Sequence, residues 1–271
     1  MQTTWHVLVD GILWVAGSVA VSLVVLWLVR RVVPHQRLTP HNEVSGFVYA
    51  AIGVIYAVLV GFAVITVWEQ ARDAETNAFQ EASATDSLYR LAAGLPEPTR
   101  TEVQQASIAY AQAVVDVEWD AMADATAPST EAVTQLDAMW VALARSTPTN
   151  ATETAILDES LDQLDQLTGH RRQRVTDSES GLLGILWAVL IGGAALTVLF
   201  PCIFGVENAP LHALIIATLA ATLGLLLFLT YDLNNPYHGD VHLRPEGFTQ
   251  FLEQVSPPAS AAMPWTVVWA R

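Results

Sequence analysis

The sequence predicts an all-α membrane protein with four transmembrane helices and an acidic helical extramembrane domain inserted between helices two and three. Of its 271 residues 52% are hydrophobic, yet the formal net charge is -15. Residues 68–181 hold 20 Asp and Glu against 7 Arg, so most of the acidity lies in one segment. Four apolar runs outside this segment are long enough to cross a hydrocarbon core of about 30 Å.

The first predicted span covers about residues 11–29. Trp14 and Trp27 lie near its ends, where interfacial aromatic residues are expected, and Arg30 follows it. No Lys or Arg precedes the apolar run, and no small-residue cleavage pattern follows it. We therefore expect a retained helix rather than a signal peptide.

The second span, about residues 46–67, is the longest helical signal. These 22 residues would extend about 33 Å as a helix, slightly more than the membrane core. No proline interrupts the polar residues from Trp68 to Ala93, and Gly94 then precedes two prolines. One helix is therefore predicted to begin inside the membrane and to end well outside it.

The rest of the chain is predicted to be helical as well. Within the acidic domain, apolar residues recur at helical spacing in segments that begin near Thr99, Ser129 and Asn150. The third and fourth spans, about 182–204 and 211–231, are separated by six residues and should form a hairpin. The predicted domains are 1–67, 68–181, 182–231 and a C-terminal tail, 232–271, with a short helix over 248–255.

Two stripes of residues run along the second span. One has small side chains and should let another helix approach closely, within one subunit or between subunits: Gly46, Ala50, Gly53, Ala57 and Gly61. The other is apolar and then acidic, at alternating spacings of three and four: Ile52, Ile55, Leu59, Phe62, Thr66, Glu69 and Asp73.

The second stripe is a candidate pore lining. Around the axis of an oligomer it would form a hydrophobic constriction with carboxylate rings at its mouth, which favour cations. The alternative is that its apolar half faces lipid or the protein core and its acidic half faces water. Only one of the two stripes can face such an axis.

Several other classes of function are disfavoured. The acidic charge argues against a nucleic-acid partner, and the four predicted spans contain no charged residue of the kind that marks ion-coupled transporters. No motif of an enzyme, cofactor site or metal site is recognised, and Cys202 is the only cysteine. His238, Asp240 and His242 could face one metal ion if extended, but a polar turn is the favoured interpretation.

The residues also carry a family resemblance. HNEVSGFVYAAIGVIYAVLVGFAVITVWEQARDAE (41–75), EAxxxDSLYRLAxGLPEP (81–98), VEWDAM (117–122) and LNNPYHG (233–239) resemble the bacterial bestrophin-like domain family. The resemblance covers nearly the whole chain. It implies a bestrophin fold in the bacterial plasma membrane, a cytoplasmic helical domain, and a pentamer in which span two lines an anion-conducting pore.

The charge pattern indicates the opposite orientation. The amino-terminal residues have no positive charge, whereas Arg30, Arg31 and Arg37 follow span one, so the positive-inside rule favours an external acidic domain. The other basic residues near the membrane lie on the side of that domain: Arg72, Arg171, Arg172, Arg174 and Arg244. Long loops weigh little in this rule.

From these observations we expect a homo-oligomeric ion channel, with a pentamer favoured. Its partners would be the lipid bilayer, other copies of the chain and small inorganic ions, without a cofactor. The acidic stripe favours cations, and the resemblance implies anions. The alternative is a non-conducting scaffold or sensor whose acidic domain binds a partner or divalent cations.

Overall fold

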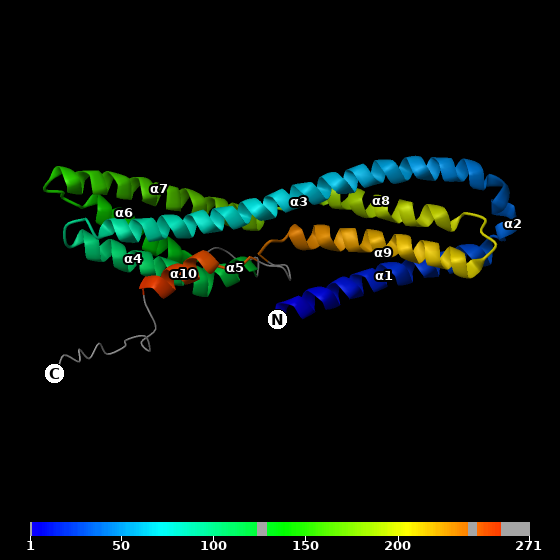
Figure 1. The fold of residues 1–271 in the computed structure, drawn as a ribbon, viewed down its shortest axis with the longest axis horizontal. Coiled ribbons are helices and arrows are strands. Elements are labelled where there is room, and N and C mark those ends of the chain that lie inside the picture. The colour runs from blue at the N-terminus through cyan, green and yellow to red at the C-terminus, as the bar shows by residue number, and fades with distance from the viewer. Residues whose placement is uncertain (1, 124–128, 238–242, 256–271) are drawn as a thin grey trace, which may run out of the picture. The chain divides into compact units, whose positions relative to one another are not determined.

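The computed structural model describes residues 2–123, 129–237 and 243–255, and every regular element within these ranges is helical (Figure 1). Four helices within these ranges are long and apolar enough to cross a membrane, which confirms the all-α membrane fold. The chain divides into two compact units. Unit 1 contains the described residues of Met1–Arg72 and Ser180–His242, and unit 2 contains those of Asp73–Glu179 and Leu243–Arg271.

Unit 1 is built from α1 (Gln2–Val32), the first part of α3 (Asn42–Ala92), α8 (Gly184–Cys202) and α9 (Ala209–Leu233). Helix α1 lies beside α9, and α8 lies beside α3 (Figure 1). One buried cluster joins α1, α8 and α9 through Leu26, Val198 and Ile216. A second joins α3 to α8 through Tyr56 and Leu190. Helix α8 is therefore shared by both clusters.

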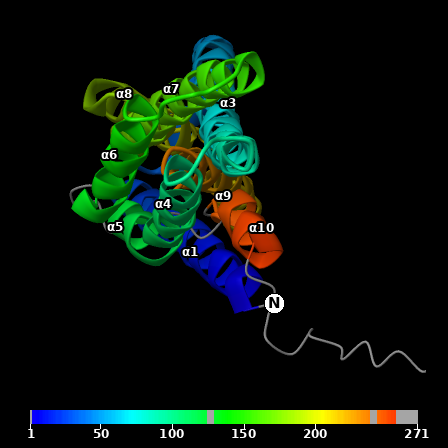
Figure 2. The same cartoon turned by 90° about the vertical axis from the view of Figure 1, so that its left-hand side faces the viewer.

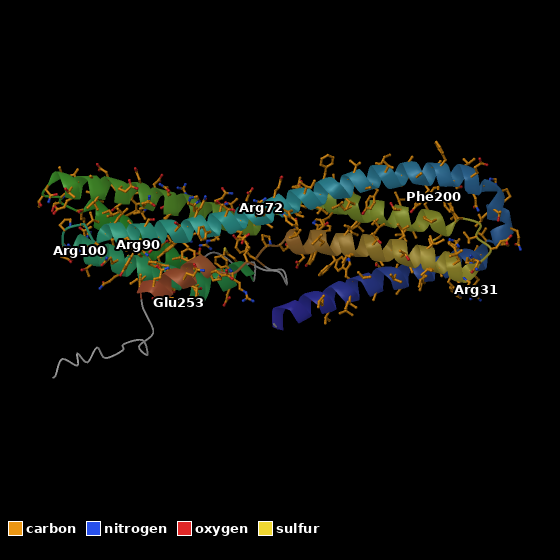
Figure 3. All side chains as sticks on the ribbon, in the orientation of Figure 1. Arg31, Arg72, Arg90, Arg100, Phe200 and Glu253 are labelled. Atoms are coloured by element: carbon orange, nitrogen blue, oxygen red, sulfur yellow. The ribbon has the colours of Figure 1, made fainter. Side chains whose placement is uncertain are left out.

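Polar side chains hold the α8–α9 connection against the α1–α3 connection, which contains α2 (His35–Leu38) and the 3-10 turn η1 (Thr39–His41). The Asn42 side chain accepts a hydrogen bond from the Gly205 N–H at 2.8 Å and donates one to the Gly205 carbonyl at 3.2 Å. Arg30 Nη1 donates to the Val206 carbonyl at 3.0 Å and lies 3.0 Å from His212 Nδ1. Phe200 and Arg31 mark this end of unit 1 in Figure 3.

A buried stripe follows α3 (Asn42–Ala92) over most of its length, from Tyr56 onward. Its members repeat every seven residues, and each is at most 5% exposed: Val60, Val67, Ala74, Glu81 and Leu88. Tyr56, four residues before Val60, lies on the same side and is 5% exposed. Helix α3 continues without a break from unit 1 into unit 2, as the unbroken sequence predicts, and this side is covered from Tyr56 to Leu88.

Unit 2 is a helical bundle that contains the end of α3, α4 (Thr99–Ala113), the π-helical turn η2 (Val114–Glu118), α5 (Trp119–Ala123), α6 (Thr130–Ala144) and α7 (Ala151–Glu179). Figure 2 looks along these helices. Ser129, near which the sequence places the start of this helix, caps α6: its hydroxyl oxygen accepts a hydrogen bond from the Glu131 N–H.

The short helix α10 (Glu246–Val255) also belongs to unit 2. Phe248 and Phe251 are nearly fully buried, and their rings contact those of Tyr110 and Tyr89 with centroids 6.2 and 5.6 Å apart. Figure 3 marks Arg90 on α3 and Glu253 on α10. The sequence pattern indicated a helix in this region but not its attachment to the bundle.

Gly205 provides a test of the contact between the α8–α9 and α1–α3 connections of unit 1, which we call the clasp. A Cβ atom at this position would overlap the Thr39 backbone, so we expect Gly205→Ala to lower the free energy of unfolding by about 1–3 kcal/mol, as overpacking does. Thermal unfolding in detergent measures the effect. Gly17→Ala is the control, because nothing lies within 4 Å of a Cβ built there. An unchanged melting temperature for Gly205→Ala would contradict the clasp.

Candidate functional site

The predicted pore-lining stripe lies beside the buried side of α3 rather than on it. Ile55 and Phe62 are 71% and 69% exposed, whereas Ile52 and Leu59 are half-buried. The polar members of the stripe are all exposed: Thr66, Glu69 and Asp73. The helix thus places these residues along one line, but its apolar members differ in their surroundings.

The difference arises from a groove between α3 and α8. This apolar groove has a volume of about 620 Å³, and Ile52 and Leu59 line it opposite Gly192 and Leu196. Ile55 and Phe62 also reach the groove, but most of their surface stays uncovered. Two of the four apolar residues of the predicted lining, Ile52 and Leu59, are therefore partly covered by α8 of the same chain.

The predicted small-residue stripe lies on the other flank of the buried side. A Cβ atom built at Gly46, Gly53 or Gly61 meets nothing within 4 Å among the described residues, and Ala50 and Ala57 are exposed. No helix in the described part of the chain packs closely against this stripe. Its surface is free for a helix from outside the chain.

A further face of α3 lies opposite the buried stripe, and sequence reasoning did not single it out. Two residues along an α-helix turn by about 200°, so residues two positions from Tyr56, Val60 or Val67 point away from the covered side. These residues are all exposed: Val54, Val58, Phe62, Ile65 and Glu69. Phe62 and Glu69 belong to this face and to the predicted pore stripe.

Unit 2 contains a buried charge cluster centred on Arg174 of α7. Its Nε donates to Glu81 Oε2 at 2.6 Å. Its Nη2 donates to Glu81 Oε1 at 3.0 Å and to Glu118 Oε2 at 3.3 Å. Arg171 Nη2 donates to Glu118 Oε1 at 2.6 Å. The Tyr110 hydroxyl donates to Glu81 at 2.5 Å. Two guanidinium groups thus balance two carboxylates, which allows the cluster to be buried.

The π-helical turn explains how Glu118 enters this cluster. Adjacent residues of a regular α-helix point in different directions, so a regular helix would not turn Glu118 and Trp119 toward the same interior. In the structure Glu118 ends the π turn, and both Glu118 and Trp119 are buried, because a π turn widens the helix by one residue. The Trp119 ring lies 5.6 Å from the Arg174 guanidinium, where a cation–π contact is favourable.

The cluster also shifts proton equilibria in unit 2. Burial raises the pKa of Tyr110 well above its usual value, and the charge of Glu81 raises it further. Burial alone would lower the pKa of Arg174, but the charge and hydrogen bond of Glu81 outweigh it and raise that pKa. Tyr110 thus stays a neutral donor and Arg174 stays charged across the physiological pH range.

The structure gives no candidate metal site within its described ranges, where no group of three or more His, Cys, Asp or Glu could hold an ion. The segment with His238, Asp240 and His242, for which the sequence favours a polar turn, lies outside these ranges. Cys202 is buried in the α1–α8–α9 cluster.

The family of the chain follows from its sequence. A model of the bestrophin-like domain matches residues 16–248. The chain belongs to the bestrophin-like family. No curated protein matches its sequence.

Solved structures agree with a bestrophin fold for this bestrophin-like protein. It resembles a bacterial bestrophin homologue from Klebsiella pneumoniae that carries one substitution, with a TM-score of 0.65 at 14% identity over 90% of this chain and 98% of the other. A second variant of the Klebsiella pneumoniae homologue gives 0.60 at 15% identity, over 92% and 96%. At these identities the likeness establishes the fold.

The charge cluster of this bestrophin-like chain predicts a large effect of removing Arg174. Arg174→Met leaves the Glu81 carboxylate buried without its main partner, so we expect a loss of about 3–5 kcal/mol in the free energy of unfolding. Chemical denaturation in detergent, followed by tryptophan fluorescence, measures it. Arg172→Met on the exposed side of α7 is the control and should change little. Equal stability of the two variants would contradict the role of the cluster.

Proposed function

We propose that this bestrophin-like chain forms a homo-oligomeric ion channel in the bacterial plasma membrane, with α3 lining the permeation path. The observation that carries the proposal is the exposed apolar face of α3 opposite its buried stripe, on a helix of transmembrane length and hydropathy. Membership in the bestrophin-like family supports the same function. A pentamer is the assembly that the family resemblance favours.

The packing of unit 1 indicates which face of α3 lines the path. Helix α8 covers the Tyr56 side of α3, so copies arranged with α3 innermost turn the opposite side to the axis. Val54, Val58, Phe62 and Ile65 then form the apolar constriction. The small-residue stripe and the Ile52–Leu59 groove lie on the two flanks, where neighbouring copies approach.

Glu69 continues this face beyond the apolar residues and would place a ring of carboxylates at its mouth. Such a ring favours cations, whereas the bestrophin resemblance implies anions. Reversal potentials under a chloride gradient separate these outcomes: a potential that follows chloride assigns anion conduction, and one that follows the cation assigns the ring of Glu69 the dominant influence.

Phe62 gives the decisive conductance test. We expect purified protein to conduct in planar bilayers and Phe62→Ala to raise the single-channel current severalfold, because a smaller side chain widens an apolar constriction. Leu59→Ala is the matched control on the same helix. Its side chain is half-buried and lines the groove against α8, so we expect a much smaller change in current.

The oligomer mass of each variant, measured in detergent by light scattering, must equal that of the wild type for this comparison. A monomeric wild type would contradict the channel. An intact oligomer that is silent under every ionic condition would favour the alternative, a non-conducting scaffold or sensor. A larger effect of Leu59→Ala than of Phe62→Ala would indicate that the side of α3 with Ile52 and Leu59 lines the permeation path.

We also propose that unit 2 lies outside the cell. The Arg171 and Arg174 side chains are paired with buried carboxylates, so they weigh less as positive charges on that side of the membrane. Arg30 and Arg31 lie in the last turn of α1, at the end that this orientation places in the cytoplasm, in agreement with the positive-inside rule.

Cysteine labelling of intact cells tests this orientation. Ala138 is exposed on α6 and is a suitable site for a cysteine probe. Ser129, at the start of the same helix, is less suitable because it is buried and caps the helix. Cys202 is the only native cysteine and is buried, which keeps the background low. We expect an impermeant maleimide to label Ala138→Cys directly and Glu207→Cys only after permeabilisation. The reverse pattern would place unit 2 in the cytoplasm.

A further inference from the structure

Tyr56 is the polar residue at which α3 meets α8 inside unit 1. Tyr56 is buried, with 5% of the residue exposed. Its hydroxyl donates a hydrogen bond to the Leu190 carbonyl of α8 at 2.9 Å. The carbonyl has a second lone pair for this bond in addition to the one used by its own helix. The contact therefore joins two helices without breaking either.

The membrane makes the loss of this hydrogen bond costly. A hydroxyl in hydrocarbon has no water to bond, so an unpaired one is costly, and the Leu190 carbonyl supplies the acceptor. The ring is fitted just as closely, because a Cβ atom at Gly193 of α8 would overlap it. The hydroxyl and the ring thus favour the same rotation of α3 about its axis.

We infer that Tyr56 is a positioning residue that fixes the rotation of α3 against α8 and so decides which face of α3 lines the permeation path. Val54 and Val58 each lie two positions from Tyr56, a turn of about 200°, so the bond to Leu190 keeps them on the exposed side of α3, where they are 66% and 54% exposed. Val58 also reaches the edge of the α3–α8 groove. The inference rests on the proposed function, since it presupposes that this face borders a water-filled path.

Tyr49 allows the hydrogen bond to be separated from aromatic packing. It precedes Tyr56 by seven residues and lies on the same side of α3, where its ring stacks on that of Phe200 with centroids 6.0 Å apart. Its hydroxyl makes no hydrogen bond within the described part of the chain. Tyr49→Phe and Tyr56→Phe are therefore the same chemical change, but only Tyr56→Phe removes an interhelical hydrogen bond.

The glycines of α8 form a second matched pair. Gly193→Ala would press on the Tyr56 ring, whereas a Cβ atom at the adjacent Gly192 meets nothing within 4 Å. A bulkier residue at Gly193 should therefore rotate α3 in the same way as loss of the hydroxyl, and Gly192→Ala should not.

The test measures the rotation of α3 by thiol accessibility, which needs no current. Val58→Cys and Val60→Cys are made separately in a Cys202→Ala background and labelled in lipid vesicles with a charged, water-soluble thiol reagent. We expect faster labelling at position 58 than at 60. Tyr56→Phe should lower this ratio by about fivefold, the change in population that loss of one net hydrogen bond produces.

The outcomes separate the inference from the function on which it rests. Gly193→Ala should lower the ratio as well, and Tyr49→Phe and Gly192→Ala should leave it unchanged, all with the wild-type oligomer mass. A ratio that Tyr56→Phe and Gly193→Ala both leave unchanged would overturn the role of Tyr56 while preserving the proposed lining. Equal labelling at 58 and 60 without further substitution would overturn the proposed lining and the inference together.

Discussion

The continuous burial of one side of α3 is the constraint on which the interpretation of this chain depends. The buried residues recur every seven positions from Val60 to Leu88, so the covered side turns around the helix slowly, by about 20° per heptad. A helix held in this way has only its other sides available for a pore or for neighbouring copies. The two stripes visible in the sequence occupy the flanks, and the opposite side is the one that we propose as the lining of a central path.

Polar groups on this buried side fix the helix more sharply than apolar packing could. Apolar side chains tolerate small rotations because dispersion contacts are not directional, whereas hydrogen bonds weaken steeply when misaligned. Tyr56 bonds to the Leu190 carbonyl in unit 1, and Glu81 makes two hydrogen bonds with Arg174 in unit 2. Each unit thus contains its own directional anchor for α3.

The charge cluster of unit 2 illustrates the cost of such an anchor. Buried ion pairs add little net stability compared with well-packed apolar residues, but removing one member leaves a costly buried charge. Glu81, Glu118, Arg171 and Arg174 come from α3, η2 and α7, so only one arrangement of these helices satisfies all four. In the clasp of unit 1, Asn42 similarly uses both its donor and its acceptor on Gly205.

The sequence by itself determined the four spans, the unbroken α3 and the family, because the length of an apolar run and the lack of breakers are local properties. It indicated two stripes on α3 but not which side is covered, since that depends on α8, more than a hundred residues away. A Glu at a heptad position of the buried stripe was a signal for Glu81, whereas no pattern predicted the π turn that buries Glu118. Only the tertiary structure decided these points, because burial is set by partners distant in sequence.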